Sequence, residues 1–74
     1  MYRILTTKEK SNIRRFIKGL TTSELQDFQR RIKLNYRNLL EAYLMDRTDS
    51  NLYHVEACQY SREVISKMNQ TNNK

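Results

Sequence analysis

The longest regular pattern of hydrophobic positions lies between residues 22 and 45. Hydrophobic residues recur there mostly at intervals of three and four, and at 100° per residue they fall within a sector of about 120°. They are Leu25, Phe28, Ile32, Tyr36, Leu39, Leu40 and Tyr43. Thr21 and Glu24 have the spacing of a capping box in front of this segment. We therefore predict a long amphipathic helix from Thr22 to Met45.

A shorter pattern of the same kind precedes it. Thr6 and Glu9 again have capping-box spacing, and hydrophobic residues then follow at helical intervals. These residues are Ile13, Phe16, Ile17 and Leu20. Gly19 predicts the end of this helix, because glycine tolerates the left-handed conformation common at helix C-termini. The expected helix covers residues 7–18.

A polar break at residues 46–50 separates the long helix from a third hydrophobic stripe. The stripe has spacings of three and four and consists of Tyr53, Ala57, Tyr60, Val64 and Met68. It predicts a helix over residues 50–68 that returns antiparallel to the second one. Residues 69–74 have no hydrophobic side chain to bury and are expected to form a disordered polar tail. The predicted fold is all-α, with one domain over residues 1–68 dominated by a long helical hairpin and a short basic N-terminal helix.

The size of the chain changes this picture in one respect. A chain of 74 residues buries only about 60% of the surface that its unfolded form exposes, so its core is thin. One Cys and one His supply neither an internal disulfide nor a structural zinc site. We therefore expect self-association, as a dimer, to add stability. The single Cys58 and the absence of a long apolar segment favour a cytoplasmic protein that does not contact membranes.

The positive charge is concentrated in the first part of the chain. Residues 1–47 hold eleven Lys and Arg against five Asp and Glu, whereas residues 48–74 hold three of each. Two groups on the predicted helices are candidates for binding phosphate: Arg14, Arg15 and Lys18, and Arg30, Lys33 and Arg37. They support one alternative function, a nucleic-acid-binding accessory protein with little sequence specificity. Charged runs on small helical proteins are more often simply solvated surface.

Residues 14–28 resemble a helix-turn-helix motif, with Gly19 at the turn. The resemblance implies that the second helix enters a DNA groove. The chain departs from the motif because Arg14, Arg15 and Lys18 occupy positions that are usually small or apolar. The second helix is also far longer than a recognition helix, and no base-reading Asn or Gln stands apart from its hydrophobic stripe.

The sequence offers little for catalysis. His54 and Cys58 are four residues apart, but no further ligand of matching type completes a metal site. A packed cysteine beside a half-buried imidazole is the better interpretation. The acidic residues are dispersed, and a single Gly cannot form a phosphate-binding loop. We expect no enzymatic activity, no metal and no cofactor.

Several hydrophobic and tyrosine residues lie where a partner would cover them. Tyrosine is enriched at protein interfaces, and leucines outside the main stripes need a cover. The candidates are Leu34, Leu44, Leu52, Tyr36, Tyr43 and Tyr53. They favour a small regulatory or adaptor protein that binds another protein through its helical hairpin. The positive charge favours an acidic partner.

Overall fold

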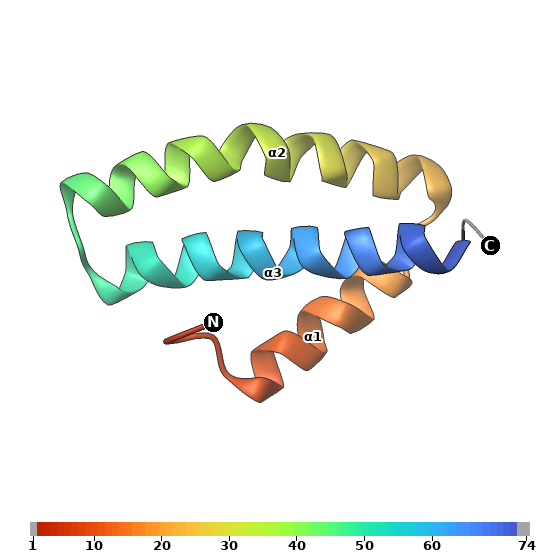
Figure 1. The fold of residues 1–74 in the computed structure, drawn as a ribbon, viewed down its shortest axis with the longest axis horizontal. Helices are drawn as coiled ribbons and strands as arrows, with labels where there is room; N and C mark the ends of the chain where they lie inside the picture. The colour runs from red at the N-terminus through yellow and green to blue at the C-terminus, as the bar shows by residue number, and fades with distance from the viewer. Residues whose placement is uncertain (1, 73–74) are drawn as a thin grey trace.

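The computed structural model describes the backbone of residues 2–72 and the side chains of residues 2–68. The described residues form three helices and no strand: α1 (Thr7–Lys18), α2 (Thr22–Met45) and α3 (Asp49–Asn72) (Figure 1). The fold is all-α, and α1 and α2 have the predicted bounds. α2 and α3 form the long antiparallel hairpin that the sequence predicts.

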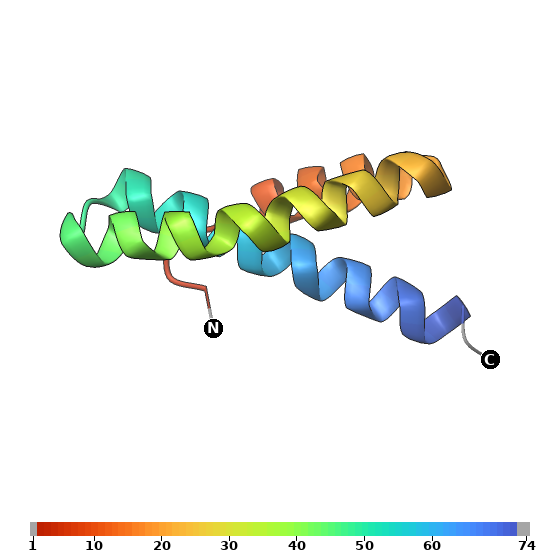
Figure 2. The ribbon, with the colours of Figure 1, turned by 90° about the horizontal axis from the view of Figure 1, so that it is seen from above.

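The three helices are arranged around α3. In Figure 1 α3 lies between α2 above it and α1 below it, so α3 packs on both of its neighbours. Figure 2 shows that α2 and α3 lie closest at the end that carries their connection and diverge toward the other end. The C-terminal part of α1 lies at that wider end.

Capping boxes determine where the first two helices begin. The Glu9 carboxylate accepts a hydrogen bond from the Thr6 backbone N–H at 2.9 Å, and the Thr6 hydroxyl accepts one from the Glu9 N–H at 3.2 Å. Thr21 and Glu24 repeat both bonds at the same distances. Each pair satisfies backbone donors that a helix start leaves without partners, which explains why these two starts were predictable from local sequence.

The end of α1 has a different cause from the predicted one. α1 does stop at Lys18, but Gly19 has φ −83° and ψ −5°, which is right-handed backbone that any residue adopts. The glycine N–H donates to the carbonyls of Arg15 and Phe16, both at 3.2 Å. The expectation of a left-handed glycine is therefore wrong. Thr21, with ψ 166°, turns the chain into α2 instead.

The third helix is longer than predicted. It begins at Asp49, where the Thr48 hydroxyl accepts a hydrogen bond from the Asn51 N–H at 3.2 Å. It continues to Asn72, four residues beyond the predicted end at Met68. The prediction of a disordered tail is wrong for residues 69–72, because no Pro or Gly follows Met68 to interrupt the helix. Residues 73–74 lie outside the described residues.

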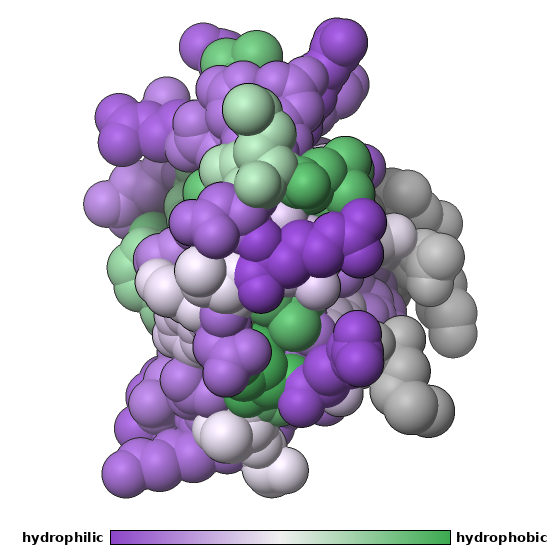
Figure 3. Space-filling view, turned by 90° about the vertical axis from the view of Figure 1, so that its left-hand side faces the viewer, coloured by the Kyte–Doolittle hydropathy of each residue, from purple (hydrophilic) through white to green (hydrophobic). Residues whose placement is uncertain are grey.

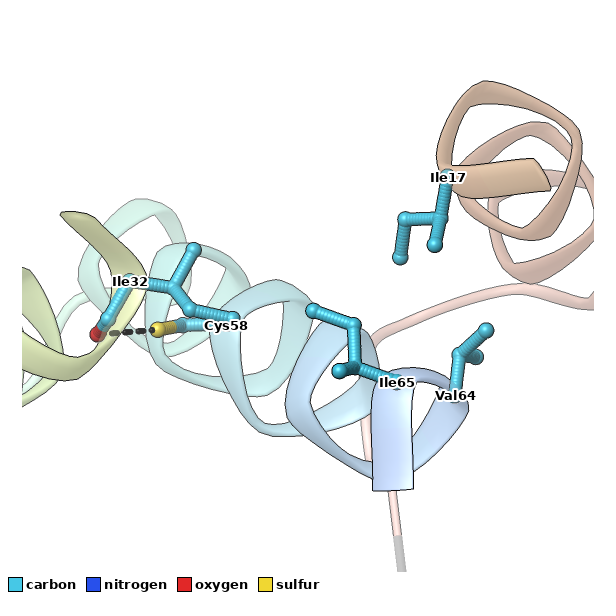
Figure 4. Packing of buried hydrophobic residues seen from close by; sticks show 5 residues of the cluster. All are labelled: Ile17, Ile32, Cys58, Val64 and Ile65. Atoms are coloured by element: carbon cyan, nitrogen blue, oxygen red, sulfur yellow. Dashed lines mark hydrogen bonds between the residues drawn. The ribbon is translucent and has the colours of Figure 1, made fainter. Parts of the chain in front are cut away.

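The hydrophobic core fills the space between the diverging helices. Ile17 of α1 is fully buried and points toward Ile65 and Val64 of α3 (Figure 4). Ile32 of α2 packs in the same cluster, and the thiol of the buried Cys58 donates to the Ile32 carbonyl at 3.3 Å. Partly buried residues surround these five: Ile13, Leu25, Phe28, Tyr36, Leu39, Tyr60 and Met68.

The N-terminal arm, residues 2–5, is not helical and is attached to α3. The Glu56 carboxylate accepts hydrogen bonds from three consecutive backbone N–H groups, those of Arg3, Ile4 and Leu5, at 2.8, 2.8 and 2.9 Å. Leu5 is buried, as is Val55, the residue that precedes Glu56 on α3. This attachment joins the arm to a residue of α3 more than fifty positions away along the chain.

Candidate functional site

The outer face of α2 carries exposed hydrophobic and basic side chains together. We define this face as Arg30, Lys33, Leu34, Arg37 and Leu44. At 100° per residue they fall within about 100° of one another, and at 1.5 Å per residue they extend over about 21 Å. All five are exposed, with Leu34 at 67% and Leu44 at 55% of their full accessible surface. The two leucines are single exposed apolar residues among basic ones, and a partner that covers the whole face would bury both of them.

The charges on this face are mostly available to a ligand. Arg37 pairs with Glu41 at 3.5 Å, but both side chains remain largely exposed. Such exposed pairs contribute only about 0–1 kcal/mol, so a stronger acidic ligand can displace Glu41. Arg30 and Lys33 form no ion pair or hydrogen bond with any described residue. The face therefore combines a net positive charge with exposed apolar side chains.

The structure divides the six predicted interface residues into two sets. Only Leu34 and Leu44 are exposed, whereas Leu52, Tyr36, Tyr43 and Tyr53 are half-buried. The hydroxyl of Tyr36 accepts a hydrogen bond from Gln59 at 2.9 Å, and Arg62 lies over its ring at 5.1 Å. These contacts join α2 to α3. Tyr36 therefore already has contacts within the fold and remains half-buried.

The other half-buried residues also have neighbours within the protein. Tyr43 stacks with Arg47 at 5.9 Å, and the Tyr53 ring meets that of His54 edge-on at 5.6 Å. Leu52 lines a small cavity together with Arg3 and Ile4 of the N-terminal arm. The position of this arm could not be predicted from the sequence. The tyrosine edge predicted for the hairpin is therefore largely occupied by intramolecular contacts.

Two exposed hydrophobic residues were missing from the predicted set. Met45 at the end of α2 is 90% exposed and Phe16 of α1 is 57% exposed. Met45 lies next to Leu44 and outside the hydrophobic stripe, a position that could have identified it. Phe16 belongs to the hydrophobic stripe of the first helix, yet it remains exposed, with its ring in a T-shaped contact with that of Phe28 at 5.5 Å between centres. Figure 3 shows that hydrophobic side chains at the end with the α2–α3 connection occupy several places among polar ones.

The six predicted phosphate-binding residues do not form one cluster. Arg14 and Lys18 line a groove between α1 and α3. Arg15 is not among the residues that line it, because it is 100° further around α1 than Arg14. The remaining three, Arg30, Lys33 and Arg37, lie on the outer face of α2. A nucleic acid would have to reach basic residues on separate surfaces.

A groove between α1 and α3 forms a concave surface of the described residues. Its volume is about 520 Å³, and it is lined by Arg14, Lys18, Tyr60, Glu63, Val64, Lys67 and Met68. The Arg14 guanidinium donates to the Tyr60 hydroxyl at 2.5 Å, which links the two helices. The sequence showed the charge on α1 but not its position opposite Lys67 of α3.

Aromatic and charged residues hold the arm beside this groove. The Tyr2 hydroxyl donates to the Glu63 carboxylate at 2.7 Å, and the Tyr2 ring meets that of Tyr60 edge-on at 5.6 Å. Burial and this hydrogen bond to a carboxylate raise the pKa of Tyr2 above its ordinary value. The same bond is the main cause that lowers the pKa of Glu63. Lys10 lies 4.9 Å from the centre of the Tyr2 ring.

The cysteine and histidine of α3 do not form a reactive pair. Cys58 is buried, and this burial raises the pKa of its thiol although the charge of Arg62 acts in the opposite direction. His54 is exposed rather than half-buried as predicted. Within residues 2–68, no three His, Cys, Asp or Glu side chains come together as metal ligands. A buried thiol in apolar surroundings is a poor nucleophile.

Comparison with models of protein families, with curated proteins and with solved structures found no match. None of the helices, over the residues described, combines the length and the apolar character needed to cross a membrane. The function must therefore be inferred from the surfaces of the protein themselves.

Proposed function

We propose that this protein is a small non-enzymatic adaptor that binds an acidic surface of another protein through the outer face of α2. The observation that carries the proposal is the exposure of Leu34 and Leu44 on the same side of the helix as Arg30, Lys33 and Arg37. The hairpin holds this face rigidly, because the opposite side of α2 packs on α3 through Ile32.

The two kinds of side chain would have different roles in binding. Burial of apolar surface contributes about 25 cal/mol for each Å² removed from water, so the two leucines would supply most of the affinity. The basic residues would attract an acidic partner over a longer range, raise the association rate and disfavour basic proteins. Mixed charged and apolar composition of this kind is typical of non-obligate interfaces.

The proposal is tested by capture of partners on three variants of the immobilised protein. Leu34→Glu and Leu44→Glu place a negative charge on the outer face of α2, whereas Asn12→Glu places the same charge on an exposed position of α1. A true partner is retained by the unaltered protein and by Asn12→Glu, and lost from both leucine variants. Circular dichroism should show the same helicity for all four proteins.

The captured partner is then purified and titrated by calorimetry at two salt concentrations. We expect the Kd to weaken with salt, because the encounter is electrostatic, and Lys33→Gln to reduce that salt dependence. The proposal fails if Asn12→Glu loses every captured protein that the leucine variants lose. It also fails if the leucine variants capture the same proteins as the unaltered chain.

Fluorescence anisotropy with labelled duplex and single-stranded DNA distinguishes the alternative function. Binding that falls steeply with salt, and that the triple variant Arg30→Gln, Lys33→Gln, Arg37→Gln abolishes, would replace the protein partner by a nucleic acid. If the partner is a protein, we expect weak DNA binding by the unaltered chain. The leucine variants should then lose the captured protein without changing DNA binding.

A further inference from the structure

We propose that the groove between α1 and α3 binds a small anionic amphiphile, that is, a carboxylate or phosphate group attached to a short hydrocarbon chain. This site is separate from the outer face of α2. The proposal rests on the charge of the groove walls, the apolar character of its floor and its volume.

The walls bring positive charge from two helices to one place. Arg14 and Lys18 are one turn apart on α1, and Lys67 faces the same groove from α3. The one carboxylate in the lining, that of Glu63, already accepts a hydrogen bond from Tyr2 and pairs with Lys67 at 3.4 Å. Lys18 has no hydrogen bond or ion pair with any described residue. An anion placed here would meet a net positive charge.

A hydrogen bond to α3 already orients Arg14 before any ligand arrives. Its guanidinium donates to the Tyr60 hydroxyl, and the Tyr60 ring is itself held by Tyr2. The remaining N–H groups of Arg14 can donate to a carboxylate or phosphate, which a guanidinium binds in a bidentate manner. Little conformational entropy is then lost when the anion binds.

The floor of the groove is apolar. It is formed by Val64, which is buried, and by Met68, which is half-buried. An inorganic anion would leave this floor in contact with water, and an uncharged hydrocarbon would leave the cations without a partner. Methionine adapts its shape to different apolar ligands, which suits a flexible hydrocarbon chain. Only a ligand with both parts uses the whole groove.

The volume of the groove fits a small molecule. The volume of about 520 Å³ lies within the range of about 300–1,000 Å³ that is typical of small-molecule sites.

The test uses octanoate as the probe, titrated into ¹⁵N-labelled protein below the concentration at which octanoate forms micelles. We expect saturable changes in the amide signals of groove residues, centred on Arg14, Lys18 and Val64. Octanol has the same chain without the charge, and acetate has the charge without the chain. Both should bind at least about tenfold more weakly, a difference of about 1.4 kcal/mol.

Two charge variants complete the experiment. Lys18→Gln should weaken octanoate binding about tenfold, as the loss of one charge-assisted hydrogen bond predicts. Its matched control is Lys33→Gln, which removes the same charge from the outer face of α2 and should leave the affinity unchanged. Because Lys18 forms no hydrogen bond or ion pair with a described residue, Lys18→Gln should retain the helicity of the unaltered protein.

The proposal is overturned if octanol binds as tightly as octanoate, if Lys33→Gln weakens binding as much as Lys18→Gln, or if the shifted signals lie outside the groove. Vesicles containing phosphatidylglycerol form a further arm, and binding to them in the absence of any octanoate binding would also overturn it. None of these results bears on partner capture by α2, so the two proposals fail separately.

Discussion

The carboxylate of Glu56 accepts a hydrogen bond from the backbone N–H of Leu5 at 2.9 Å, although 51 positions separate the two residues in the chain. The backbone N–H groups of Arg3 and Ile4 donate to the same carboxylate. Glu56 is only 3% exposed. Burial alone would raise the pKa of Glu56. The three hydrogen bonds and the charge of Arg3 outweigh burial, so the pKa lies below its ordinary value of 4.5.

Glu56→Gln should therefore destabilise the protein near neutral pH. The amide retains one oxygen for the arm but presents N–H groups where the carboxylate accepted a bond, so we expect a loss of about 1–3 kcal/mol. A lowered pKa in the folded state contributes stability above the unfolded pKa, and this contribution is lost as the pH falls through the folded value. The difference between the two proteins should therefore shrink below about pH 4.5.

Urea unfolding at neutral and acidic pH measures this difference. Glu41→Gln is the control, because Glu41 lies in an exposed ion pair and should change stability by less than about 1 kcal/mol. A gap between unaltered protein and Glu56→Gln that widens in acid would contradict the assignment.

Gly19→Ala should make the protein more stable. The backbone at Gly19 is right-handed, and an added Cβ would meet the carbonyl oxygens of Arg15 and Phe16 at ordinary distances of 3.5 and 3.6 Å. Replacing glycine at such a position restricts the unfolded chain and stabilises by about 0.4–1 kcal/mol. Thermal unfolding followed by circular dichroism gives the sign. A lower melting temperature would indicate that glycine is required at the end of α1 after all.

Ile17→Ala should be among the most damaging single changes. Ile17 is fully buried between α1 and α3, so its truncation leaves a cavity and costs about 2–5 kcal/mol. Leu34→Ala removes a similar side chain from an exposed position and should change stability by no more than about 0.5 kcal/mol. Comparable losses from both variants in urea unfolding would mean that Leu34 is covered in solution.

The thin core and the exposed leucines predict self-association. In the absence of another partner, we expect the purified protein to sediment as a dimer at micromolar concentration, with the two copies burying Leu34 and Leu44. Added salt should strengthen this dimer, because it screens the repulsion between the basic residues of the two copies. Leu44→Glu should shift the equilibrium to the monomer without loss of helicity, and Asn12→Glu should not. If sedimentation equilibrium shows a monomer at all concentrations, the protein does not self-associate, and the outer face of α2 binds only other proteins.

Local sequence determined the helices and their main boundaries. The capping boxes at Thr6 and Thr21 act through hydrogen bonds to residues three positions later, so the starts of α1 and α2 need no information from elsewhere in the chain. The hydrophobic period likewise identified Ile32 as a core residue and left Leu34 outside the stripe. The polar composition of residues 69–72 is a poor guide to the end of α3, because nothing in that segment breaks a helix.

Tertiary structure decided what depends on contacts between distant segments. The attachment of the arm to Glu56 cannot be read from either segment, because backbone N–H groups carry no sequence signal. The same holds for the groove, in which Arg14 and Lys18 meet Lys67 only because Ile17 packs on Ile65 and sets how α1 lies on α3. Periodicity gives the side of a helix on which a residue lies. Only the packing of one helix on another decides which residues of the two helices meet.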